Sequence, residues 1–92
     1  MSKTFLEDVE NGKEFLVKDG RVVRNLKELA QVIKEIPLEI FLHHVNEEKN
    51  DFADWIKQVI GDFLLANRIK RFRSRSSISR LIERRVLELI FL

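Results

Sequence analysis

The sequence predicts a mainly α-helical protein, in which an N-terminal β-hairpin packs on a bundle of about five short helices. Two observations predict this fold class. The dipeptide Asp19-Gly20 separates two short β-prone runs, as in a tight hairpin turn. From residue 26 onward, apolar residues recur at the spacing that places side chains on one helix face. A chain of 92 residues, 45% of them hydrophobic, is enough for one domain with a small core.

The expected single domain, residues 1–92, divides into four parts along the chain. The first part shows no clear periodicity, so we expect an arm that is either flexible or pinned to the body. The second part forms the hairpin and the third forms the helical core. The last part is a C-terminal helix that begins basic and ends apolar. In order, the four parts are residues 1–13, 14–24, 25–73 and 74–92.

The first two helices are bounded by Asn25 and Pro37. Asn25 can accept hydrogen bonds from the free amides of a helix start, and Glu28 stands three residues on, as in a capping box. We therefore expect a helix over residues 26–36, which Pro37 interrupts. A second helix over residues 38–45 follows, with Ile40, Phe41 and Val45 buried.

The third, fourth and fifth helices are also predicted from their end signals. Asn50 caps the third, Gly61 ends it, and Asp62 caps a fourth helix over residues 63–72. A polar break at residues 74–77 precedes the last helix, which continues to the end of the chain. The apolar residues expected to face the core are Phe52, Trp55, Ile56 and Val59, then Leu64, Leu65, Ile69 and Phe72. In the last helix the apolar residues recur at helical spacing, and they are Ile78, Leu81, Ile82, Val86, Leu89 and Ile90.

The middle of the chain carries a distinctive string of residues. It includes Asp19-Gly-Arg, Asn25-Leu-Lys-Glu-Leu and His43-His-Val-Asn-Glu-Glu-Lys-Asn-Asp-Phe-Ala-Asp-Trp-Ile-Lys-Gln-Val-Ile-Gly-Asp62, followed by Leu65-Ala66. The pattern HVN, NDFA-x-W-[IV], GD, LA resembles a small domain of unknown function found in archaea and some bacteria, over about residues 15–90. The resemblance implies the fold and an intracellular, microbial setting, with no established activity or cofactor. An N-capped helix with buried aromatics explains the same residues physically.

Charge is concentrated in one stretch, residues 68–85, which we call the basic segment. It holds eight basic residues and the single acid Glu83, a net charge of +7, whereas residues 1–67 hold thirteen acidic residues and nine basic ones. Clustered arginines with a planar fork suit phosphate oxygens, and a surface of this kind attracts polyanions. The basic segment therefore indicates a polyanionic partner.

The basic segment also resembles the second half of a helix-turn-helix, a helix followed by a short polar turn and a second helix beginning at Ser77. We predict a non-enzymatic nucleic-acid-binding protein that prefers double-stranded DNA to RNA. The residues expected to hold phosphates are Arg68, Lys70, Arg71, Arg73 and Arg75. Those expected to approach the groove are Ser77, Arg80 and Arg84, and Arg85 completes the predicted interface.

Three other readings of the C-terminal region remain open. The arginines can instead pair with acidic residues, within or between subunits, which predicts a protein-interaction module or dimerising adapter that meets acidic protein surfaces. The apolar ending, residues 86–92, must be covered either by the domain's own core or by a second subunit, and the second alternative is a homodimer through the C-terminal helix. A helix lying on a membrane ranks third.

Several classes of function lack their usual residues. The chain has no cysteine, which excludes disulfides and thiolate zinc sites. His43 and His44 are adjacent, so their rings would diverge on a helix and form a poor metal site. No phosphate-binding glycine loop or nucleophile motif occurs. We therefore expect no catalytic residue, metal or cofactor. The absence of a leader and of a run of ~20 apolar residues predicts a cytoplasmic protein without a membrane segment.

Overall fold

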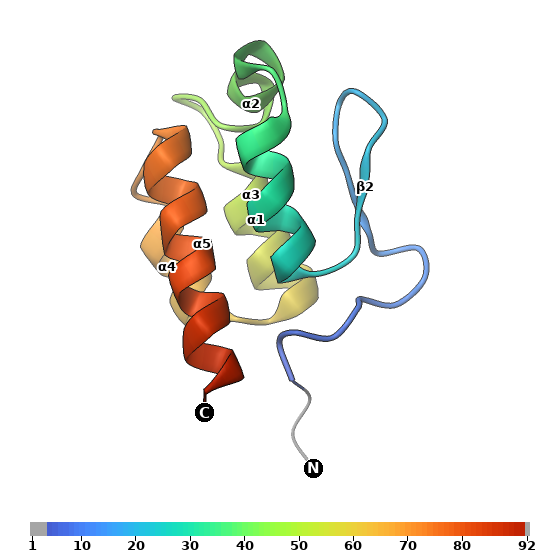
Figure 1. Cartoon of the computed structure of the whole chain (residues 1–92). Coiled ribbons are helices and arrows are strands. Elements are labelled where there is room, and N and C mark those ends of the chain that lie inside the picture. The colour runs from blue at the N-terminus through green and yellow to red at the C-terminus, as the bar shows by residue number, and fades with distance from the viewer. Residues whose placement is uncertain (1–3, 92) are drawn as a thin grey trace.

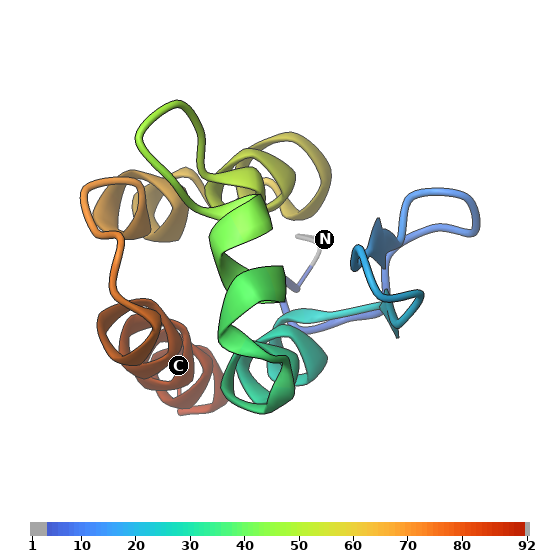
Figure 2. The same cartoon turned by 90° about the horizontal axis from the view of Figure 1, so that it is seen from above.

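The computed structural model describes residues 4–91, and within them a two-stranded hairpin is followed by five α-helices and one π-helical turn. The hairpin stands beside the helices, and the helices surround a common interior (Figures 1 and 2). This arrangement confirms the predicted fold class. In chain order the elements are β1 (Phe15–Leu16), β2 (Val22–Val23), α1 (Leu26–Glu35), α2 (Leu38–His44), α3 (Asp51–Trp55), η1 (Ile56–Ile60), α4 (Phe63–Ile69) and α5 (Arg75–Ile90).

The hairpin forms where Asp19-Gly20 predicted it. Its strands are antiparallel, with Phe15 opposite Val23, and Gly20 takes the positive φ of 100° that glycine tolerates without strain. Phe15 and Val23 are buried, whereas Leu16 is exposed. One face of the ribbon therefore supplies apolar side chains to the core, because successive strand residues point to opposite sides.

Residues 4–13 contain no helix or strand, but they are held against the body. The Val9 amide donates to the Arg24 carbonyl oxygen at 2.8 Å, and Val9 is buried. The indole N–H of Trp55 donates to the Lys13 carbonyl oxygen, also at 2.8 Å. The described part of the predicted arm is thus pinned, while residues 1–3 of that arm lie outside the described residues.

Capping side chains set the starts of three helices as predicted. Asn25 Oδ1 accepts from the Glu28 amide at 2.9 Å, Asn50 Oδ1 accepts from the Ala53 amide at 3.0 Å, and Asp62 Oδ1 accepts from the Leu65 amide at 3.2 Å. Each bond spans three residues, so local sequence is enough to produce it.

The end of the third helix differs from the expected regular α-helix. From Ile56 to Ile60 the chain forms η1, a π-helical turn, and the Gly61 amide donates to the Ile56 carbonyl oxygen at 2.8 Å. Gly61 has a φ of 88°, which ends the helix where glycine was predicted to end it. The wider turn closes a hydrogen bond over five residues, a feature for which the sequence carries no recognised signal.

The boundaries of α4 and α5 correct two predictions. Helix α4 ends at Ile69 rather than residue 72, so Phe72 leaves the helical register and is 42% exposed, while Leu64 is 50% exposed. Residues 74–77 are not a break, because Ser74 Oγ accepts from the Ser77 amide at 3.3 Å and caps a helix that begins at Arg75. Serine hydroxyls at this position satisfy free helix amides.

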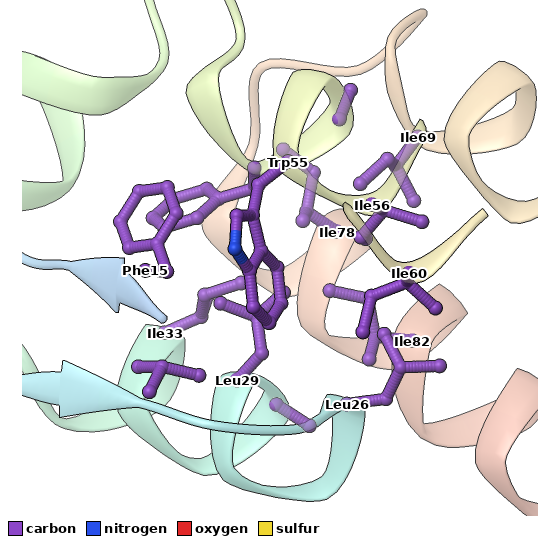
Figure 3. Close-up of a cluster of buried hydrophobic side chains, with 14 of the residues drawn as sticks. Phe15, Leu26, Leu29, Ile33, Trp55, Ile56, Ile60, Ile69, Ile78 and Ile82 are labelled. Carbon is purple, nitrogen blue, oxygen red and sulfur yellow. The ribbon is translucent and has the colours of Figure 1, made fainter. Parts of the chain in front are cut away.

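The core lies between α1, α3, η1 and α5, with α4 and the hairpin closing it (Figure 3). Helices α1 and α5 lie side by side (Figure 1), and Trp55 sits near Phe15 with ring centroids 5.9 Å apart. Burying each large apolar side chain contributes about 1.5–3 kcal/mol. The labelled core residues are Phe15, Leu26, Leu29, Ile33, Trp55, Ile56, Ile60, Ile69, Ile78 and Ile82. Among residues 4–91, no helix is both long enough and apolar enough to cross a membrane.

Candidate nucleic-acid interface

The connection between α4 and α5 carries the most accessible cations of the basic segment. We call residues 70–73 the cationic turn. Lys70, Arg71 and Arg73 are exposed, and none of them forms an ion pair with an acid among residues 4–91. The turn has a defined backbone, because the Phe72 amide donates to the Ile69 carbonyl oxygen at 3.0 Å. Three free cations therefore lie on four successive residues.

A cleft of about 530 Å³ lies beside this turn. Its other walls are the loop over residues 46–50 and parts of α3, η1 and α4. The loop and the turn lie at the same end of the bundle (Figures 1 and 2). The amide nitrogen of the Asn50 side chain donates to the Ile69 carbonyl oxygen at 3.2 Å. This bond joins the two walls, because Asn50 belongs to the loop and Ile69 ends α4.

The walls of this cleft, called the cationic cleft from here on, carry both signs of charge with cations in excess. Lys49 and Lys57 add to the cationic turn from elements outside the basic segment, and sequence analysis did not single them out. No local pattern marks them, since only folding brings residues 49, 57 and 70–73 together. The charged residues that line the cleft are Lys49, Lys57, Lys70, Arg71 and Arg73 against Glu47, Glu48 and Asp54.

Lys49 is held by Asp51, with Nζ 3.0 Å from Oδ2. Asp51 also accepts a hydrogen bond from Nδ1 of His44 at 3.0 Å. Burial acts to raise the pKa of Asp51, but the bonds from His44 and Lys49 outweigh it and hold this pKa below its ordinary value. Nε2 of His44 accepts from the Lys18 amide at 3.1 Å. These two bonds assign the neutral imidazole with its proton on Nδ1.

Arg80 and Arg84 form a second accessible pair, on the outer face of α5. Both are exposed and neither is ion-paired within residues 4–91. They lie four residues apart, so they share one helix face, and exposed Ser76 continues this stripe toward the cationic turn. Ser77, which was expected to approach the groove, is half-buried, and its amide is used by the Ser74 cap.

Two further arginines of the basic segment are partly engaged within the protein. Arg68 Nη1 lies 3.6 Å from Glu88 Oε1. Arg75 lies over the Phe41 ring, with its guanidinium carbon 5.7 Å from the ring centroid, and its Nη1 donates to the Lys34 carbonyl oxygen at 3.1 Å. Both side chains are half-buried, so they keep only part of their hydrogen-bonding capacity for a ligand.

Arg85 is turned inward and bonds to Asp62. Its Nε lies 2.7 Å from Asp62 Oδ2 and its Nη2 lies 3.2 Å from Oδ1, while Asp62 is 1% exposed. These hydrogen bonds to Asp62 are the main cause that raises the pKa of Arg85 above its ordinary value. Because Asp62 also caps α4, Arg85 fastens α5 to the start of α4 and is committed to the fold.

The structure thus separates the nine predicted interface residues into three groups. Lys70, Arg71 and Arg73 meet at the cleft, and Arg80 and Arg84 lie on the outer face of α5. The others are partly or wholly engaged inside the protein, and they are Arg68, Arg75, Ser77 and Arg85.

Within residues 4–91, no three acidic or histidine side chains are grouped so as to hold a metal ion. His43 and His44, the two imidazoles of the chain, have nearly perpendicular rings, 84° apart. Only His44 is buried, where it links the hairpin turn to α3 through Lys18 and Asp51.

Comparisons of the chain with protein-family models, with curated proteins and with solved structures found no match. The resemblance to the archaeal and bacterial domain of unknown function stays a prediction. The cationic turn, the cationic cleft and the exposed face of α5 are the features that point to a function.

Proposed function

We propose that this protein is a non-enzymatic nucleic-acid-binding protein that prefers double-stranded DNA. The observation that carries the proposal is the cationic turn, in which Lys70, Arg71 and Arg73 are exposed without an acidic partner among residues 4–91. Elsewhere, cations such as Arg21 and Arg85 face carboxylates at short range. Cations left free beside a cleft are available to neutralise phosphates.

Duplex DNA is the preferred form because of its charge density and its shape. A duplex carries one negative charge per roughly 1.7 Å of axis, so each cation meets a dense row of phosphates. The order of α4, connection and α5 is that of a helix-turn-helix, with Arg80 and Arg84 on the exposed face of the second helix. A helix fits the wide major groove of B-DNA, whereas the narrow major groove of an RNA duplex excludes it.

The proposal is tested by anisotropy titration of a labelled, blunt-ended DNA duplex over a series of salt concentrations. Affinity should fall as the salt concentration rises. In a plot of log affinity against log salt concentration, each phosphate contact removed should make the slope shallower by roughly 0.9. The variant Lys70→Gln, Arg71→Gln, Arg73→Gln should therefore flatten the slope by about 2.7. Its free energy of unfolding should change by no more than about 0.5 kcal/mol per residue, because these side chains are exposed.

The matched control removes three other exposed cations that have no ion pair within residues 4–91. The control variant is Lys18→Gln, Arg24→Gln, Lys27→Gln, and it should bind the duplex much as the wild-type protein does. Equal weakening by both triple variants would mean that net charge alone attracts DNA. Absence of binding to any duplex or single strand at low salt would end the proposal. An RNA duplex in the same titration measures the preference for DNA.

A second candidate function, a dimerising or protein-interaction module, is favoured by the end of α5. Leu87, Ile90 and Phe91 are exposed there, Phe91 by 81%. A groove of about 360 Å³ between α1 and α5 lies next to them and includes Val86 and Leu87 in its walls. Contact between apolar surfaces predicts self-association that resists salt. Analytical ultracentrifugation of the wild-type protein and of Phe91→Ser, at low and high salt, tests it.

A further inference from the structure

A second hollow of about 350 Å³ shares Asn67, Arg71 and Phe72 with the cationic cleft. Its remaining lining residues are Leu64, Arg68 and Leu81. We call this hollow the apolar groove, because leucine and phenylalanine side chains make up half of its lining. The turn that carries the free cations therefore borders a polar cleft and an apolar groove at once.

Two apolar side chains in this groove are open to solvent. Leu64 and Phe72 are exposed by 50% and 42%, although both were expected to face the core. The backbone at Phe72 is held by the hydrogen bond from its amide to the Ile69 carbonyl oxygen and by the Ser74 cap two residues later. A half-exposed aromatic ring on a turn with a defined backbone, with the free residues Arg71 and Arg73 next to it in the sequence, is a suitable platform for a flat partner group.

The polar groups around the groove indicate the chemistry of that partner. Arg71 supplies a free guanidinium group and Arg68 one that also faces Glu88; such groups pair with phosphates and also stack on flat rings. Asn67 is exposed, and its amide carries both donors and acceptors. No acidic residue lines the groove. An apolar ring platform with cations and one amide complements a nucleotide, which joins an anionic phosphate to a flat base.

We propose that the apolar groove binds an unpaired nucleobase stacked on Phe72, while the neighbouring phosphates lie on the cationic turn. This inference rests on the proposed nucleic-acid-binding function and specifies that the preferred ligand contains an unpaired base. In a blunt duplex every base is stacked and paired, so the groove stays unused. A duplex with a single-stranded extension supplies an unpaired base next to the duplex phosphates and is therefore the better ligand.

The test compares a blunt DNA duplex with the same duplex carrying a short thymidine extension, by anisotropy at one salt concentration. Stacking on an aromatic side chain contributes about 1–3 kcal/mol per base, so the extension should raise affinity roughly 5- to 150-fold. Phe72→Leu keeps an apolar side chain without a π-face and should abolish this gain. Phe72→Trp should retain it, and for each variant the quantity compared is the ratio of its affinities for the extended and the blunt duplex.

A second variant and a spectroscopic signal make the result specific. Leu64→Ser, on another part of the groove lining, should also reduce the gain. A 2-aminopurine at the first unpaired position should change its fluorescence on binding wild-type protein and Phe72→Trp, but much less with Phe72→Leu. The salt slope should be the same for Phe72→Leu and wild type, because the phosphate contacts remain.

Equal affinity for blunt and extended duplexes, or a gain that survives in Phe72→Leu, overturns this inference and leaves the proposed function standing. Absence of binding to both duplexes overturns the two together. If Phe72→Leu converts a dimer to a monomer in sedimentation, a second copy of the chain covers the groove and the inference is also overturned.

Discussion

Arg85 and the cationic turn belong to the same basic segment, yet they have opposite surroundings. Arg85 is 13% exposed at its side chain and makes two short bonds to Asp62. Arg71 and Arg73 are exposed and have no acidic partner within residues 4–91. The difference shows that a count of charges along the sequence says little about which charges a ligand can reach. Which charges a ligand can reach depends on the side of the helix that each residue occupies and on the position of Asp62.

The largest expected effect follows from breaking the inward pair. Arg85→Ala leaves Asp62 buried without its partner, which should lower the free energy of unfolding by about 3–5 kcal/mol. Arg84→Ala, at the neighbouring exposed position, should change it by about 0.5 kcal/mol or less. Urea denaturation followed by circular dichroism measures both. Under conditions where both variants are folded, only Arg84→Ala should weaken duplex binding. Similar losses of stability in the two variants would contradict the comparison.

An intermediate effect is expected at the bond that joins the walls of the cationic cleft. Asn50→Ala removes the cap of α3 and the bond to the Ile69 carbonyl oxygen, which should cost about 1–2 kcal/mol of stability. Asn25→Ala is the matched control, because Asn25 caps α1 in the same way without lining the cleft. Both should be destabilised in urea, but only Asn50→Ala should weaken DNA binding. Unchanged binding by Asn50→Ala would show that this bond does not position the cationic turn.

The smallest expected effect is at Asp51, whose pKa is held below its ordinary value. Ionised Asp51 stabilises the folded state at every pH above its unfolded pKa, near 3.8, and this contribution is lost as the pH falls through the folded pKa. Asp51→Asn should therefore be less stable than wild type at neutral pH, by about 1 kcal/mol or less. The difference should disappear in acid, as thermal unfolding over a pH series would reveal.

The same substitution also tests whether duplex DNA enters the cationic cleft. Asp51→Asn removes the carboxylate that holds Lys49, so it should bind duplex DNA more tightly than wild type. Asp54→Asn is the control, because it removes a carboxylate from the cleft lining without touching Lys49. A gain in affinity for both variants would be an effect of cleft charge, and no gain for either would show that DNA does not enter the cleft.

Sequence reasoning succeeded where a structural feature depends on a few neighbouring residues. The caps at Asn25, Asn50 and Asp62 and the turns at Gly20 and Gly61 were all predicted. It failed at Leu64 and Phe72, because apolar character was taken to mean burial. Helix α4 turns Leu65 and Ile69 inward, as predicted, but it leaves Leu64 exposed and ends too early to carry Phe72 into the core.

The sequence by itself determined the order of the hairpin and the five α-helices, the caps at Asn25, Asn50 and Asp62, the turns at Gly20 and Gly61, and the concentration of positive charge in residues 68–85. Those features arise from interactions over two to four residues. Only the tertiary structure decided which cations are free, because Arg85 meets an acid 23 residues away and Lys57 joins the cationic turn from another helix. Long-range packing sets these distances, and no local pattern encodes them.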